Sequence, residues 1–249
     1  MKIAVVTVAL GHHYPRGVAR MIQAFEKNSP GYQLMAWINT LPPGAPERVI
    51  EDGWDYTGYC AKPFAMKAAM DAGAEIVLWL DCSVYPIRSI TPLVEYISAH
   101  GYYMAPTGFT IGEWSSDAVL EGFKVERGGW MDKKECASGI VGLDLRRERG
   151  ARLLYQWECN WRYFPGHHSN VHAADKEHHY KNVGHVSMDP RCSGHRHDQT
   201  VLSLLAHELG LTEWVPWPKF VAYQAGYSTV PGQSGMPNEE TCLVIKGIP

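Results

Sequence analysis

No two of the six cysteines are spaced as a Cys-x-x-Cys pair, the arrangement on which zinc ribbons and dithiol redox sites are built. The spacing argues against both kinds of site. It favours reduced thiols with a structural role at Cys60, Cys82, Cys136, Cys159, Cys192 and Cys242. Cys82 follows Asp81 directly, but no neighbouring feature of the sequence marks it as an activated nucleophile.

The sequence also lacks an excess of charge and a long apolar run. A net charge of −3 and a pI near 6.4 give no field that would attract nucleic acid or an anionic membrane over a distance. The apolar run IAVVTVAL near the amino end is too short and too lightly flanked by charge for a signal peptide or a membrane span. We therefore expect a cytoplasmic protein that does not bind nucleic acid.

Alternating strand and helix patterns are present instead. The chain begins with a strand, a helix and a second strand, and a further helix and buried strand follow; the predicted ranges are 5–10, 16–27, 33–38, 62–72 and 75–80. Pro63 would occupy the first turn of the second helix. This order is typical of right-handed crossovers between parallel strands. It predicts one α/β domain over residues 1–249, with a Rossmann-like, mostly parallel central sheet flanked by helices.

The second half continues this pattern with two interruptions. Residues 108–135 show no period and are predicted to form a long functional loop, and a long His-rich loop is predicted after residue 158. Regular elements are expected at 91–100 (helix), 102–105 (strand), 138–144 (strand), 146–157 (helix), 198–209 (helix) and 241–246 (strand).

Asp81 is the first candidate site residue. It follows the run Ile76-Val77-Leu78-Trp79-Leu80, whose lack of polar alternation predicts a strand covered on both faces. In open α/β sheets, ligands bind outside the carboxyl ends of such strands. Asp198 is a second candidate, although an acidic residue at a helix start has a sufficient structural reason in the helix dipole.

Eight histidines lie between Phe164 and Asp198, namely His167, His168, His172, His178, His179, His185, His195 and His197. Three interpretations remain open: a zinc site, side chains that contact a phosphate or a sugar, and a solvated loop. Only His195 and His197 form a short-spaced pair next to Asp198.

Three segments in order carry a resemblance to a known family: AKPFAMKAAMDAGAEIVLWLDCSVYP, ASGIVGLDLR and HDQTVLSLLAHELGL. Together they resemble glycosyltransferases of the GT-A fold, nearest to the galactosyl/xylosyltransferase type of fungal mannan and plant xyloglucan synthesis. The resemblance implies transfer of a sugar from a nucleotide-diphosphate donor, such as a UDP-sugar, to a hydroxyl acceptor on a glycan or small molecule. If it extends to stereochemistry, the transfer retains the anomeric configuration.

Residue roles follow from the same resemblance. Asp81 would face the ribose and diphosphate of the donor, and Lys62 would contact the donor or Asp81. Asp198 and Gln199 would lie beneath the reacting sugar as catalytic residues, and His197 would contact the substrate. Further substrate contacts are assigned to Thr7, Ala9 and His12 for the nucleoside, to Ser83 beside Asp81, and to Ser138 and Gly139 on the acceptor side.

The sequence departs from the family at the metal site. Ser83 stands where the family has the second Asp of Asp-x-Asp, and Tyr223 or Gln224 stands where the family has a metal-binding His. A hydroxyl is a poorer ligand for a hard divalent ion than a carboxylate. The sequence therefore leaves open whether Mn²⁺ or Mg²⁺ is used; a rebuilt site would combine Asp81 with His195 or His197.

Other functions remain open at this point. The His cluster could serve a metal-dependent hydrolase together with Asp81 and Asp198. The loss of a metal ligand also fits a non-catalytic module that binds a nucleotide or sugar.

Overall fold

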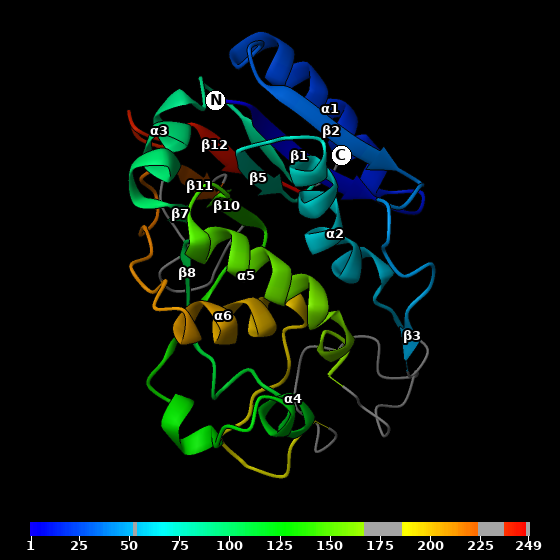
Figure 1. Cartoon of the computed structure of the whole chain (residues 1–249), viewed down its shortest axis with the longest axis vertical. Coiled ribbons are helices and arrows are strands. Elements are labelled where there is room, and N and C mark those ends of the chain that lie inside the picture. Colours follow the sequence, from blue (N-terminus) through cyan, green and yellow to red (C-terminus); the bar gives the residue numbers. More distant parts are fainter. Residues whose placement is uncertain (52–53, 167–185, 224–236, 248–249) are drawn as a thin grey trace.

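A computed structural model describes residues 1–51, 54–166, 186–223 and 237–247, and its centre is a five-stranded sheet of order β2-β1-β5-β10-β7 (Figure 1). These strands are β1 (Ile3–Ala9), β2 (Gln33–Ile38), β5 (Ile76–Leu80), β7 (Tyr102–Tyr103) and β10 (Ile140–Asp144). β1 is parallel to β2 and β5, whereas β10 is antiparallel to β5 and β7. The predicted α/β class is confirmed.

The sheet is mixed rather than mostly parallel, which corrects the prediction. The chain leaves the sheet after β7, forms an insert of residues 106–136, and re-enters at the edge where β5 ends. β10 must then run back against β5, so that Ile140 pairs with Leu80. This reversal places the residues before β10 next to the carboxyl end of β5.

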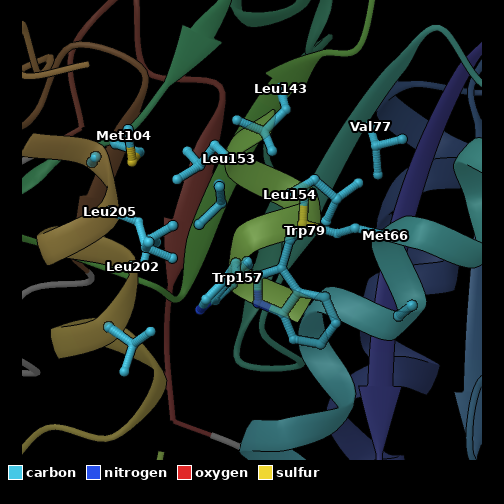
Figure 2. Packing of buried hydrophobic residues seen from close by; sticks show 14 of the residues in the cluster. Met66, Val77, Trp79, Met104, Leu143, Leu153, Leu154, Trp157, Leu202 and Leu205 are labelled. Atoms are coloured by element: carbon cyan, nitrogen blue, oxygen red, sulfur yellow. The ribbon is translucent and has the colours of Figure 1, made fainter. Parts of the chain in front are cut away.

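Helices cover both faces of the sheet, as the continuous apolar run of β5 predicted. Val77 and Trp79 belong to one core, and Ile76, Leu78 and Leu80 belong to another. The first core is completed by α2 (Thr57–Asp71), α5 (Glu148–Cys159) and α6 (Asp198–Glu208), and the second by α1 (Tyr14–Asn28) and α3 (Thr91–His100). Figure 2 shows the first core, in which Trp79 lies among side chains of α2 and α5.

The helix before β5 begins earlier than predicted. α2 starts at Thr57, so Pro63 lies inside the helix and not in its first turn. The added residues are held by side chains, because the Asp55 carboxylate accepts a hydrogen bond from the Thr57 N–H at 2.9 Å. The Thr57 hydroxyl in turn accepts one from the Val49 N–H at 2.9 Å. Short strands β3 (Ile50–Glu51) and β4 (Trp54–Asp55) precede the helix.

The predicted long loop at 108–135 is instead an ordered insert. It contains β8 (Pro106–Thr110), α4 (Asp117–Gly122), the 3-10 turn η1 (Arg127–Trp130) and β9 (Lys134–Cys136). The buried Arg127 guanidinium holds it together by donating to the carbonyl oxygens of Gly112 and Ser115 and by pairing with Asp117 at 2.7 Å. A buried cation with several partners was not visible as a sequence pattern.

The rest of the described chain completes the domain. A second sheet of order β11-β12-β6 contains β6 (Val84–Pro86), β11 (Val221–Tyr223) and β12 (Leu243–Ile245), and the 3-10 turn η2 (Trp161–Tyr163) follows α5. The six cysteines are thiols, and Cys159 alone among them is exposed. Among the described residues, we find no helix with the length and apolar content needed to cross a bilayer.

Candidate functional site

Asp81 lies directly after β5, where two contacts fix it. Its backbone N–H donates to the Gly139 carbonyl oxygen at 2.8 Å, and its Oδ1 accepts from the Trp79 indole N–H at 2.9 Å. Trp79 is itself held in the core by burial. The carboxylate is therefore anchored by the sheet while part of it stays exposed at the sheet edge.

Lys62 joins Asp81 to Asp198. Its Nζ atom lies 3.1 Å from Asp81 Oδ1 and 3.0 Å from Asp198 Oδ2, and it donates to the Ser138 hydroxyl at 3.4 Å. Only 7% of the Lys62 side chain is exposed. One buried ammonium thus brings together a strand end, a helix start and the entry to β10.

Asp198 is the first residue of α6 and is almost fully buried. Its carboxylate accepts a hydrogen bond from Ser138, and its carbonyl oxygen accepts one from the Trp157 indole N–H at 3.1 Å. The preceding residue, His197, has a φ of 57°, a conformation that costs a residue with a side chain about 1–3 kcal/mol. Backbone strain of this kind is often found at functional sites.

The charges of this cluster depend on one another. Burial raises the pKa of Asp198, and the negative charge of Asp81 acts in the same direction, whereas Lys62 and Ser138 lower it; the net result is a raised pKa. Burial acts to lower the pKa of Lys62, but the charges and hydrogen bonds of Asp198 and Asp81 outweigh it and raise that pKa. Lys62 is therefore a fixed positive charge and not a proton acceptor.

The cluster borders a hollow with a volume of about 370 Å³, the size range of small-ligand sites. Carboxylate, ammonium, guanidinium, hydroxyl, amide and aromatic groups all contribute to it, which suits a polar ligand with flat faces. The lining residues are Tyr59, Lys62, Asp81, Ser83, Val84, Ala105, Ala137, Ser138, Gly139, Ile140, Arg196, His197, Asp198, Gln199, Trp217, Tyr223 and Ile245.

Eight of the residues predicted from the sequence meet in this hollow. Asp81 and Asp198 share Lys62, while Ser83, Ser138, Gly139, His197 and Gln199 line the same space. Gly139 is needed for close approach, because a Cβ atom at this position would lie 3.1 Å from Asp81 Oδ2.

The residues predicted to contact the nucleoside belong to β1 and the turn that follows it. Thr7 and Ala9 lie in β1 with 0% and 1% of their surface exposed, and His12 is exposed in the turn that follows. Ala9 is covered because it packs with Val18 of α1 and with Cys82. None of the three lines the hollow, although β1 and β5 end at the same edge of the sheet.

The predicted metal set of Asp81, His195 and His197 does not come together. The rings of His195 and His197 both contact the Phe164 carbonyl oxygen, at 3.1 and 3.2 Å, and His195 is fully buried outside the hollow. Among the residues that the structure describes, no three His, Cys, Asp or Glu side chains are grouped to hold a metal ion. The other six histidines fall at 167–185, outside the described residues.

Sequence reasoning missed several residues of the hollow. Tyr59 and His197 form one aromatic contact, with ring centres 4.8 Å apart, and Trp217 and Tyr223 form another at 5.2 Å. The sequence indicated Arg196 only as one of several basic residues, with Lys62, Lys67 and Arg191, that could neutralise a leaving diphosphate in place of a metal. Tyr59 falls in the part of α2 that the predicted helix left out, and Arg196 and Trp217 lie outside helices and strands, so no periodic pattern marked them.

Comparisons with known proteins give fold-level likenesses only. No known family and no curated protein matches the chain. The chain is similar to a glycosyltransferase involved in the glycosylation of the major capsid of PBCV-1, at 14% identity and a TM-score of 0.39, over 66% of this chain and 71% of that one. It is also similar to galactosyltransferase LgtC, solved with donor and acceptor sugar analogs, at 13% identity and a TM-score of 0.43, over 97% of this chain and 86% of that one. At these values the function has to be inferred from the chain's own site.

Proposed function

We propose that this chain is a glycosyltransferase of the GT-A type, nearest to the galactosyl/xylosyltransferase type, that moves a sugar from a nucleotide-diphosphate donor to a hydroxyl acceptor. The observation that carries the proposal is the pairing of Asp81 and Asp198 through one buried lysine, at the rim of a polar hollow. A donor sugar with its diphosphate presents hydroxyls and negative charge, and the hollow offers partners for both.

Each side chain has a role in this proposal. Asp81, anchored at the sheet edge, accepts hydrogen bonds from ribose or sugar hydroxyls. Asp198 and Gln199 lie under the reacting sugar, where a carboxylate stabilises positive charge that develops at the anomeric carbon. Lys62 and Arg196 offset negative charge on the leaving diphosphate. Ser138 and Gly139 border the acceptor side, and exposed His12 is the candidate contact for the nucleoside.

The divalent cation implied by the resemblance does not fit the described residues. Ser83 contributes no charge, and its carbonyl oxygen already accepts hydrogen bonds from the Lys246 N–H and the Arg20 guanidinium. Asp81 Oδ1 is engaged by Lys62 and Trp79. A lysine ammonium thus lies between the carboxylates where a bound cation would compete with it. We infer that charge neutralisation at the donor falls to Lys62 and Arg196.

The alternative of a metal-dependent hydrolase is not favoured, because the described residues provide no group of three ligands. A non-catalytic binding module remains the rival, and turnover of a donor distinguishes the two.

The proposal predicts that nucleoside diphosphates stabilise the folded chain without a metal. A ligand present at 100 times its dissociation constant adds about 2.7 kcal/mol to the free energy of unfolding. We expect at least one of UDP, GDP, ADP and their sugars to raise the Tm by binding the folded chain. The rise should be the same in EDTA and in Mn²⁺. The measurement is a thermal-shift screen under both conditions.

The matching nucleoside without phosphates serves as the control for base binding alone. Stabilisation that needs Mn²⁺ would contradict the metal-free site. No stabilisation by any donor would contradict the proposed function itself.

A further inference from the structure

Glu135 of β9 is a fully buried carboxylate just behind the hollow, and the proposed roles above do not use it. Its Oε2 atom accepts three hydrogen bonds: from Gln199 Nε2 at 2.8 Å, from Arg196 Nη1 at 3.2 Å and from the Thr107 hydroxyl at 3.1 Å. Two of these three donors, Gln199 and Arg196, line the hollow. Glu135 therefore touches the site only through other residues.

Burial disfavours the charged form of the Glu135 carboxylate. Burial, the largest influence, raises the pKa of Glu135 to about 7, although Arg196, Thr107 and Gln199 act to lower it. Its Oε1 atom has no hydrogen-bond partner among the described residues. A buried ion pair stabilises a fold no better than well-packed apolar side chains do. Stability alone thus gives no reason for a carboxylate at this position.

Gln199 is fixed at both ends of its amide. The Oε1 atom accepts a hydrogen bond from the Ser138 N–H at 3.3 Å, and the Nε2 atom donates to Glu135. A carboxylate can only accept hydrogen bonds, so Glu135 must face the NH₂ group of Gln199 and not its oxygen atom. Glu135 thereby fixes the orientation of the amide.

Arg196 is fixed on three sides. Its guanidinium carbon lies 4.5 Å from the centre of the Phe109 ring and 4.7 Å from that of Trp114, and Glu135 holds one of its nitrogens. Such contacts with ring faces stabilise a guanidinium in one plane. About 23% of the side chain remains exposed, and the residue lines the hollow.

We propose that Glu135 is a positioning residue, which orients the Gln199 amide and the Arg196 guanidinium for the ligand in the hollow. Its effect on turnover rests on the proposed function, whereas its effect on the two side chains does not. A site whose polar groups are held in place before the ligand binds loses little in ordering them during the reaction.

The first test reads the two side chains directly by NMR. In the full wild-type chain, the side-chain NH₂ signals of Gln199 should shift with a midpoint near pH 7, because Glu135 loses its proton there. Burial raises the pKa of the adjacent Cys136 thiol to about 12, so this group does not titrate in the same range. In Glu135→Gln this titration should vanish, and the Arg196 Nε–H should become more mobile.

The control is Glu113→Gln, which changes a glutamate of the same insert that contacts Ser193 and not the hollow. This variant should keep the Gln199 titration. A wild-type chain whose Gln199 signals do not move between about pH 5 and pH 9, or a Glu135→Gln variant that behaves like wild type, would overturn the positioning role.

The second test uses whichever nucleotide sugar the chain turns over. Glu135→Gln should lower kcat by at least about ten-fold while the KM for the donor changes by less than about three-fold, because the variant loses the acceptor that orients Gln199 and Arg196 but keeps both of these ligand-binding groups. Unchanged kcat alongside the lost NMR titration would overturn the link to turnover. Absence of turnover in wild type would count against the proposed function and leave the NMR result to decide on Glu135.

Discussion

Replacing Lys62 by methionine is expected to lower the free energy of unfolding by about 3–5 kcal/mol, because the change leaves two carboxylates without their shared cation. Asp198 is buried, so water cannot solvate the carboxylate charge that would be left without its cation. Urea unfolding of the two proteins measures the difference. Lys67→Met is the matched control on the same helix, since Lys67 forms an exposed pair with Asp71 at 2.7 Å; such a pair contributes about 0.3–0.5 kcal/mol.

A double variant keeps this prediction decisive if the single variant does not fold. Lys62→Met combined with Asp198→Asn removes the buried charge along with its partner, so the double variant should be more stable than Lys62→Met alone. A Lys62→Met protein as stable as wild type would contradict the bridging role of Lys62. So would a double variant whose losses simply add.

Replacing Asp198 by asparagine is expected to lower kcat for sugar transfer by about 10²–10³-fold. The amide keeps the shape of the side chain but removes the negative charge beneath the reacting sugar. Lys62 keeps Asp81 as a partner, so we expect the affinity for the nucleoside diphosphate to change by less than about three-fold. Release of nucleoside diphosphate from the donor measures the rate.

Asp71→Asn on the exposed surface of α2 is the control for this prediction, and it should leave kcat unchanged. A kcat of Asp198→Asn within about three-fold of wild type would exclude Asp198 as a catalytic residue. A loss of nucleotide affinity with an unchanged kcat would assign it to ground-state binding instead.

The parts of this fold that sequence could predict are those with a strong local pattern. The run Ile76 to Leu80 identified a strand covered on both faces, and the Asp that follows it had to lie at the sheet edge. The helical spacing after Asp198 likewise identified α6. Both carboxylates therefore emerged from periodicity and element order.

What sequence could not predict depends on contacts between distant segments. The direction of β10 was decided by where the insert returns the chain, and Glu135 by its distance from Gln199 and Arg196. Neither the direction of β10 nor the role of Glu135 corresponds to a local pattern in the sequence. Thr7 is the converse case: it was assigned to a ligand because its strand ends at the same edge of the sheet as β5, and the structure packs its side chain into the interior.

Binding of a nucleoside diphosphate to wild type and to Asp81→Ala, measured by isothermal titration in EDTA, tests the central claim most directly. The Asp81 carboxylate, at the rim of the hollow and paired with Lys62, should supply hydrogen bonds that the alanine lacks. We predict saturable one-site binding to wild type and at least about ten-fold weaker binding to the variant, as expected for a lost hydrogen bond to a charged group. Equal affinity in the two proteins would remove Asp81 from the donor site and contradict the account.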